Sequence, residues 1–378
     1  MKKTLAAMAV LGAFAGSAFA ADVTVYGVVD LGLNYQHQRV GDADATDKLT
    51  QYSGQNSGSR FGLKGTEDLG NGMKVGFVLE NGFSADDGKL GQGNRLFGRE
   101  ARLFVNGAFG EVAFGRMGTL GSANGTYGLL GNLSPFGASW VGAVEYSTYY
   151  VGGIRADNTV TYKTPTFAGF NLLAQYSFDK NVKKDDDDAT TGVQHGREGS
   201  AETDRQYALG ATFAAGDLYL AGIVTQTNKQ SVKSNGKSLG KQDDPLTVSL
   251  GGNYNFGVAK LYVATQYFKD TGLAVEMIQT GTTGTFDGFG LSVGADVPAF
   301  GGTAKVLVGY MDAEDQTTTA NDVQRYTFSV GYEYPLSKRT FVYGGAGYYM
   351  DSYDKGSKDG YDDKASVAAV NAGLVHKF

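Results

Sequence analysis

Apolar and polar residues alternate along most of this chain, in runs of roughly ten residues separated by polar or turn-like connections. Residues 60–80 read RFGLKGTEDLGNGMKVGFVLE, and apolar residues take every second position on both sides of Asn71-Gly72. An Asn-Gly pair between two alternating runs is typical of a β-hairpin turn. The pattern therefore predicts two paired strands whose apolar face includes Phe61 and Phe77. The charged residues share the opposite face: Arg60, Lys64, Lys74 and Glu80.

The same period of two recurs along the chain, in segments such as 23–33, 170–178 and 325–334. Each segment is close to the ten or so residues that a tilted strand needs to cross a bilayer. Two kinds of sheet fit this pattern. In a soluble sheet the apolar face packs on a core, whereas in a membrane barrel it meets lipid and the polar face lines the lumen.

Short and long connections alternate along the chain, and this alternation favours the membrane barrel. The short ones lie near 67–72, 107–110, 165–169, 214–217, 255–258, 299–302 and 335–339. The long polar ones lie near 37–57, 82–94, 117–154, 180–203, 229–244, 271–287, 312–322 and 351–364. Seven short and eight long connections make fifteen, which join sixteen strands. We expect an all-β fold, a sixteen-stranded antiparallel transmembrane β-barrel with short periplasmic turns, long external loops and an aqueous channel.

Residues 1–20 have the pattern of a secretory signal peptide. Lys2 and Lys3 precede an uncharged run that ends in the sequence AFA at 18–20. This run is short for a membrane-spanning helix, and small residues at its end favour cleavage. We expect cleavage after residue 20, which leaves one barrel domain at 21–378 and places the protein outside the cytoplasm.

Composition agrees with an exported all-β protein. The chain has 57 Gly, 23 Tyr and 22 Phe but only 5 Pro and no Cys, so disulfides cannot stabilise it. The formal net charge is −6, and loss of the two lysines in the leader makes it −8. A negative net charge argues against nucleic acid as a partner.

The chain ends on an aromatic residue that is in phase with an apolar face. Phe378, Leu374 and Val370 alternate with polar or small residues over the last strand, 365–378. A soluble domain more often ends in a frayed polar tail. We therefore predict that Phe378 is an assembly signal and that the last strand closes the barrel.

No enzyme is predicted, and neither a cofactor nor a metal. The three histidines, His37, His195 and His376, have no Ser or Asp partner at a catalytic spacing, and no H-E-x-x-H motif occurs. The acidic run 185–188 is expected to be a solvated loop tip, with a divalent-cation site as the alternative. Acidic pairs in other long loops would make the outer mouth negative: 86–87, 243–244 and 362–363.

Several motifs of this chain resemble those of the general diffusion porins of Gram-negative bacteria, above all the beta-proteobacterial and neisserial type. They are VTVYGVVDLGL after the leader, RFGLKGTEDLGNG, FGEVAFGR, NTVTYKTPTFAGFN and the final LVHKF, so the resemblance spans the whole mature chain. It implies a homotrimer in the outer membrane, in contact with lipids and lipopolysaccharide. It also implies passive diffusion of ions and small hydrophilic solutes.

The resemblance further implies that the third external loop, 117–154, folds into the barrel and narrows it. This loop contains SPF at 134–136 and Trp140, and it has no charged residue between Met117 and Val144. A segment without charge suits packing inside a barrel. The alternative is an ordinary Gly-rich surface loop.

In the family, lumen arginines face acids on this loop. By position, the resemblance implies Arg60, Arg102 and Arg155 as constriction residues, with Lys64 on the face of Arg60. Each could instead be a lumen charge away from the narrowest point. The acids depart from the pattern, because Glu145 alone lies near the end of the loop and Glu100 lies among the basic positions.

These charges predict a modest preference for anions rather than a strong field across the pore. Two rival functions stay open at this point. One is a surface-exposed barrel that acts mainly as an adhesin or receptor through its long loops, and the other is a soluble exported binding protein.

Overall fold

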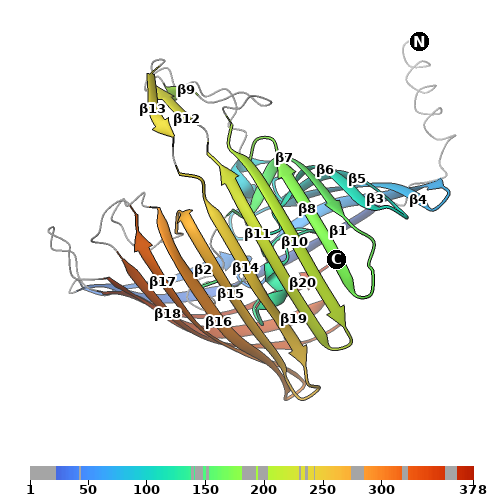
Figure 1. Ribbon diagram of the computed structural model, residues 1–378. Coiled ribbons are helices and arrows are strands. Elements are labelled where there is room, and N and C mark those ends of the chain that lie inside the picture. The colour runs from blue at the N-terminus through green and yellow to red at the C-terminus, as the bar shows by residue number, and fades with distance from the viewer. Residues whose placement is uncertain are drawn as a thin grey trace, which may run out of the picture.

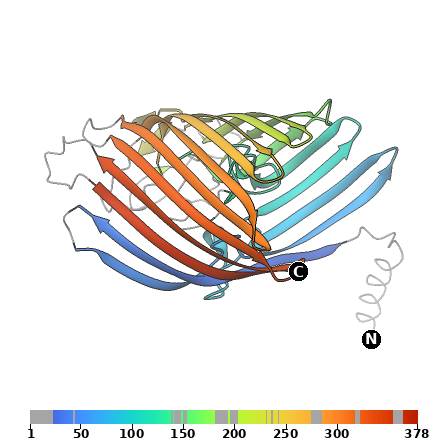
Figure 2. The same cartoon turned by 90° about the horizontal axis from the view of Figure 1, so that it is seen from below.

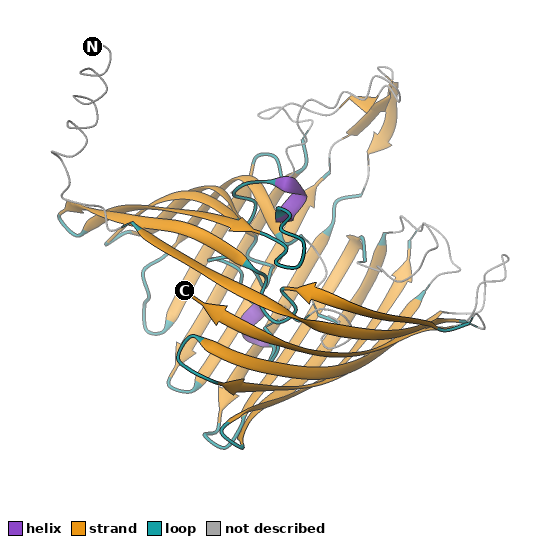
Figure 3. Ribbon diagram, turned by 180° about the vertical axis from the view of Figure 1, so that it is seen from behind, coloured by secondary structure: helices purple, strands orange, loops and turns teal. Residues whose placement is uncertain are grey.

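The computed structural model describes residues 23–41, 44–137, 140, 148–149, 153–180, 193–194, 203–229, 231–234, 237–241, 243–273, 285–316, 322–353 and 364–378. The predicted signal peptide, Glu145, His195 and the acidic run 185–188 lie outside these residues. In the described part, strands dominate (Figure 3), and the helices are the short α2 (Gly91–Asn94) and η1 (Leu130–Leu133). None of the helices in the described ranges has the length and apolar character needed to cross a membrane.

Most strands of the main sheet pair with the strands before and after them in this sheet, all antiparallel (Figure 1); β2 and β3 both pair with β1. They are β1 (Thr24–Val40), β2 (Thr46–Ser53), β3 (Arg60–Gly70), β4 (Met73–Gly82), β5 (Glu100–Gly107), β6 (Gly110–Gly118), β7 (Arg155–Lys163), β8 (Phe170–Ser177), β10 (Arg205–Ala215), β11 (Leu218–Asn228), β14 (Leu246–Asn255), β15 (Lys260–Thr271), β16 (Phe286–Ala299), β17 (Gly302–Asp315), β18 (Val323–Pro335), β19 (Thr340–Tyr353) and β20 (Lys364–Lys377). A small separate sheet holds β9 (Val193–Gln194), β12 (Ser231–Ser234) and β13 (Lys237–Lys241).

The last strand closes the barrel on the first. β20 pairs with β1 from Val28↔Lys377 to Val40↔Ala365, and Figure 2 shows the red end of the chain beside the blue strand. Gly27 and Phe378 exchange two backbone hydrogen bonds, at 3.1 and 3.0 Å. A Cβ on Gly27 would lie 2.3 Å from the Phe378 ring, so a glycine is needed there. Closure leaves no open edge in the described part of the main sheet, as lipid requires.

The main sheet has seventeen strands in the structure, but two of them form one strand of the barrel. β2 pairs with the C-terminal part of β1, from Leu31 to Gln38. β3 pairs with the N-terminal part of β1, from Thr24 to Val28. The two therefore lie end to end beside β1, separated by residues 54–59. Counted this way, the barrel has sixteen strands, which confirms the predicted number.

The two faces of the sheet are inverted relative to those of a soluble protein. On β18, Tyr326 and Phe328 are 45% and 48% exposed, whereas the flanking Arg325 and Ser329 are 3% and 0% exposed. In the hairpin at 60–80, Phe61 on the predicted lipid face is exposed, and Val78 on the predicted lumen face is buried. An outward apolar face and an inward polar face are typical of a transmembrane barrel. The predicted face assignment is confirmed for this hairpin.

The connections are short at one end of the barrel and long at the other, as predicted, with one correction. The predicted loop 37–57 is wrong, because β1 continues to Val40 and β2 begins at Thr46. The physical reason is that strands extending past the lipid are wetted on both faces, so QHQRV and TDKLTQY show no apolar alternation.

Candidate functional site

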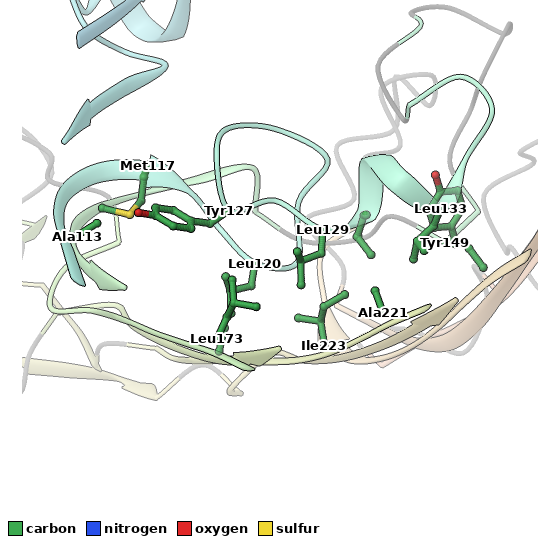
Figure 4. Packing of buried hydrophobic residues seen from close by; sticks show 13 residues of the cluster. Ala113, Met117, Leu120, Tyr127, Leu129, Leu133, Tyr149, Leu173, Ala221 and Ile223 are labelled. Carbon is green, nitrogen blue, oxygen red and sulfur yellow. The ribbon is translucent and has the colours of Figure 1, made fainter. Parts of the chain in front are cut away.

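The lumen contains an inward loop, which we define as the connection between β6 and β7, residues 119–154. Its described part packs apolar side chains on the inner wall of the barrel. Leu120, Tyr127, Leu129, Leu130 and Leu133 are all buried. Figure 4 shows loop residues above strand residues of the wall, which are lumen-facing and small or apolar. The wall partners are Leu173, Ala208, Ala221, Ile223 and Ala264.

Polar side chains of the wall satisfy the backbone of this loop. The Gln175 side chain accepts from the Leu120 N–H at 3.2 Å and donates to the Gly118 carbonyl at 3.1 Å. The Asn253 amide donates to the Asn132 carbonyl at 2.7 Å. Buried backbone groups need such partners. The predicted inward fold of the third loop is therefore confirmed for its described residues, and packing on an apolar wall explains their lack of charge.

The far end of the described loop lies against the opposite part of the wall. Phe136 and Trp140 are buried, with ring centroids 4.9 Å apart, and Trp140 lies 5.4 Å from the Tyr343 ring of β19. Gly331 on β18 leaves room for both rings, because a Cβ there would lie 2.7 Å from Phe136 and 3.0 Å from Trp140. The Lys305 ammonium donates to the Pro135 carbonyl at 2.8 Å.

A first group of charges surrounds Glu80 on the wall formed by β3 to β5. The Glu80 carboxylate lies 2.6 Å from Arg99 Nε and 3.8 Å from Arg60 Nε, and it accepts a hydrogen bond from the Tyr26 hydroxyl at 2.9 Å. Lys64 is exposed, and its ammonium lies 5.2 Å from the centroid of the Tyr26 ring. Arg60 and Lys64 thus lie together on the lumen face, as the alternation predicted.

Arg102 and Glu100 belong to a different part of the site, beneath the inward loop. Arg102 is 8% exposed and lies 3.5 Å from Glu100; it donates to Thr126 Oγ1 and to the Tyr127 hydroxyl, each at 3.2 Å. Glu100 in turn accepts the Thr126 N–H at 2.6 Å. The Tyr127 hydroxyl also donates to Glu111, and burial raises the pKa of Tyr127. This pair therefore anchors the base of the loop and is covered by it.

A second group of charges surrounds Asp157, which is buried where β7 begins. Its carboxylate lies 2.7 Å from Arg95 and 2.6 Å from Arg116. The register of β6 and β7 shifts at this point, and Asn158 has a φ of +46°, which marks a bulge. Arg155, two residues earlier, donates to the Arg99 carbonyl at 3.0 Å. The structure therefore brings Arg155 next to the first group.

These groups include three arginines that the sequence pattern did not predict: Arg95, Arg99 and Arg116. The first two lie in the connection 83–99, and the third lies beside the bulge, so no strand alternation indicates their direction. The FGR motif that carries Arg116 was part of the family resemblance, and it was the one available signal. Six arginines now stand against Glu80, Glu100, Glu111 and Asp157, which leaves a balance of two positive charges, and Lys64 makes it three.

Comparison with known proteins agrees with this architecture. The model of the Gram-negative porin family matches residues 6–354. An outer membrane porin protein of Bordetella pertussis is 34% identical over the full length of both chains. Outer membrane porin protein 32 of Delftia acidovorans is 31% identical, over 91% of this chain and 88% of its own.

A solved structure described as an anion-selective porin from Comamonas acidovorans has the same fold. It superimposes with a TM-score of 0.68 over 94% of this chain and 99% of its own, at 27% identity. The family model, the full-length relatives and the closed sixteen-stranded barrel all agree. The chain therefore belongs to the Gram-negative porin family.

Proposed function

We propose that this porin is a passive, water-filled channel of the outer membrane through which ions and small hydrophilic solutes diffuse, with a weak preference for anions. The observation that carries the proposal is the arginine-rich wall opposite an inward loop whose described part is uncharged. Between Thr119 and Gly137 the loop has no charged residue, so this part of it supplies no carboxylate to balance the wall. Selectivity in such a pore depends on its width and on the charges that line it.

The preference is weak because most of the arginines have acidic neighbours on the same wall. Glu80 lies between Arg60 and Arg99, and Asp157 lies between Arg95 and Arg116. The solved relative from Comamonas acidovorans is described as anion-selective, which supports the same sign for this chain. We expect the constriction to include Arg60, Lys64, Arg102, Arg155 and Glu100; Glu145 lies outside the described residues.

The experiment is single-channel recording of the purified protein in a planar bilayer. We expect stepwise conductance that grows with salt, and a reversal potential of anion-selective sign across a salt gradient. Absence of conductance in correctly inserted protein would favour the adhesin or receptor function. No feature of the described residues supports that function. A cation-selective sign would contradict the role of the arginines.

We further propose assembly as a homotrimer among outer-membrane lipids and lipopolysaccharide, which the family resemblance supports. Chemical cross-linking in native membranes tests it, with a ladder that ends at three subunits as the expected result.

We also propose that the protein has no enzymatic role. Among the described residues, no group of three His, Cys, Asp or Glu side chains could hold a metal ion. The imidazoles of His37 and His376 bond to Asp47 and Thr340.

A further inference from the structure

A second segment enters the lumen besides the inward loop. Residues 54–59, here called the insert, leave the wall after β2 and return to it at β3. Ser53 and Ser59 meet across the base of the insert, with their hydroxyl oxygens 3.0 Å apart. Gln55 and Asn56 near its tip are 0% and 7% exposed. The insert is therefore a packed element of the lumen rather than a surface loop.

The carboxylate of Asp30 on β1 holds the insert in place. Asp30 is fully buried, and its Oδ2 accepts the backbone N–H groups of Asn56 and Ser57, both at 2.7 Å. Its Oδ1 accepts the hydroxyl of Tyr343 at 2.8 Å. Hydrogen bonds to an ionised carboxylate are about twice as strong as those between neutral groups. One buried acid thus joins the insert to β19 from the far end of the chain.

A second path leads from the insert to the inward loop. The Asn56 side chain donates to Glu333 Oε1 at 2.8 Å. The other oxygen of Glu333 lies 3.5 Å from the Lys305 ammonium, and that ammonium donates to the carbonyl of Pro135 in the inward loop. The loop continues to Phe136 and Trp140, whose rings lead back to Tyr343. These contacts form a closed chain, which we call the Asp30 ring: Asp30, Asn56, Glu333, Lys305, Pro135, Phe136, Trp140 and Tyr343.

We propose that Asp30 is a positioning residue that holds the insert and the far end of the inward loop as one unit, and so fixes the width of the channel. This inference rests on the proposed channel function. A buried carboxylate that loses a donor is disfavoured, and hydrogen bonds in one network strengthen each other, so loss of one of the three weakens the hold of Asp30 on the insert. Because the contacts close on themselves, release of either segment removes support from the other. A fixed constriction gives one steady conductance level.

The first test compares two variants with a matched control in single-channel recording. Tyr343→Phe removes one hydroxyl from the Asp30 ring, changes no charge and keeps the aromatic ring against Trp140. Asp30→Asn removes the charge that three donors share. The control is Asn34→Ala, since Asn34 lies on the lumen side of the same strand, is 2% exposed and, among the described residues, makes no side-chain hydrogen bond to a member of the Asp30 ring. We expect both ring variants to lose the steady level and flicker between sublevels, whereas the control stays steady.

Reversal potential separates positioning from a direct effect on ions. Tyr343→Phe should leave the reversal potential unchanged while it raises current noise, because no pore charge has been altered. The double variant of Tyr343→Phe and Asp30→Asn should give no more current noise than Asp30→Asn alone, because the two residues belong to one coupled unit. Steady currents in both ring variants, or equal noise in the control, would overturn the proposal.

Two further outcomes remain decisive. If Asp30→Asn does not insert, Tyr343→Phe alone decides, because it removes a single hydroxyl. If the wild type does not conduct, the proposed function fails, and amide hydrogen exchange then tests positioning on its own. Faster exchange in both 54–59 and 130–137 of Tyr343→Phe supports the Asp30 ring, and unchanged exchange in either segment overturns it.

Discussion

Neutralising Glu80 should strengthen the anion preference of the channel. Its carboxylate lies between Arg99 at 2.6 Å and Arg60 at 3.8 Å, so it offsets positive charge where the lumen wall is most basic. Glu80→Gln keeps the size of the side chain and an oxygen that can accept from Arg99 and Tyr26. The substitution therefore removes a charge while the local packing stays the same.

The expected size follows from Coulomb's law. One unit charge about 6 Å from a passing ion contributes roughly 0.7 kcal/mol at the dielectric constant of water. Loss of a negative charge stabilises a passing anion and destabilises a cation by the same amount. The difference is about 1.4 kcal/mol, or roughly tenfold in the anion-to-cation permeability ratio. Screening over a Debye length of about 8 Å halves this at physiological salt, to roughly threefold.

The assay is the reversal potential across a salt gradient, measured at low and at physiological ionic strength. Asp217→Asn is the matched control, since it removes the same charge from a short turn between β10 and β11. Arg99→Gln should shift the potential in the opposite direction, and the double variant with Glu80→Gln should return close to the wild type. No shift in Glu80→Gln, or a shift equal to that of the control, would refute the reasoning.

Three other changes test closure, face assignment and a partly buried lysine. Deleting Phe378 removes its two bonds to the first strand, so the amount of heat-modifiable barrel should fall; an unchanged yield would contradict this. Phe77→Arg on the lipid face should lower stability in urea by roughly 2–4 kcal/mol, whereas Val78→Arg should mainly change conductance, and equal losses would show a wrong register. Burial lowers the pKa of Lys180 to about 8, so barrel stability should rise as pH increases from about 8 to 10, and the melting temperature of Lys180→Met should lack this rise.

The barrel itself could be predicted because lipid imposes one rule on every strand. Outward positions must be apolar within the bilayer, so alternation identified the strands, their faces and their number. Val78 and Phe61 illustrate this, since one is buried and the other exposed as their parity required. The inward loop was also predictable, through its long uncharged sequence and the family resemblance.

The insert could not be predicted from the same pattern. The sequence SGQNSGS at 53–59 is small and polar, and it lies next to strand ends that project beyond the lipid. Such a sequence suits an exposed loop as well as a packed segment. What distinguishes them is Asp30, about 25 residues earlier in the chain, whose buried carboxylate accepts two N–H groups of the insert.

The charged groups of the lumen wall were predictable in type but not in detail. Alternation correctly placed Arg60 and Arg102 on the lumen side, yet it could not show that Thr126 and Tyr127 would cover Arg102. Arg99 and Arg116 lie where strand pairing starts or shifts, and there the direction of a side chain depends on tertiary contacts. Glu145 lies outside the described residues, so its role stays a prediction.

The position of the acids follows from how the inward loop is held. Its described residues lie on an apolar stretch of wall, against side chains such as Leu173 and Ile223, and a carboxylate there would be buried without a partner. Among the described residues, the acids that balance the arginines are therefore found on the strands themselves, as Glu80 and Glu100. Acid and base on one wall neutralise each other locally instead of across the lumen. The field that a passing ion meets is then a small difference between near neighbours, which is why a single acid, Glu80, should change the selectivity so strongly.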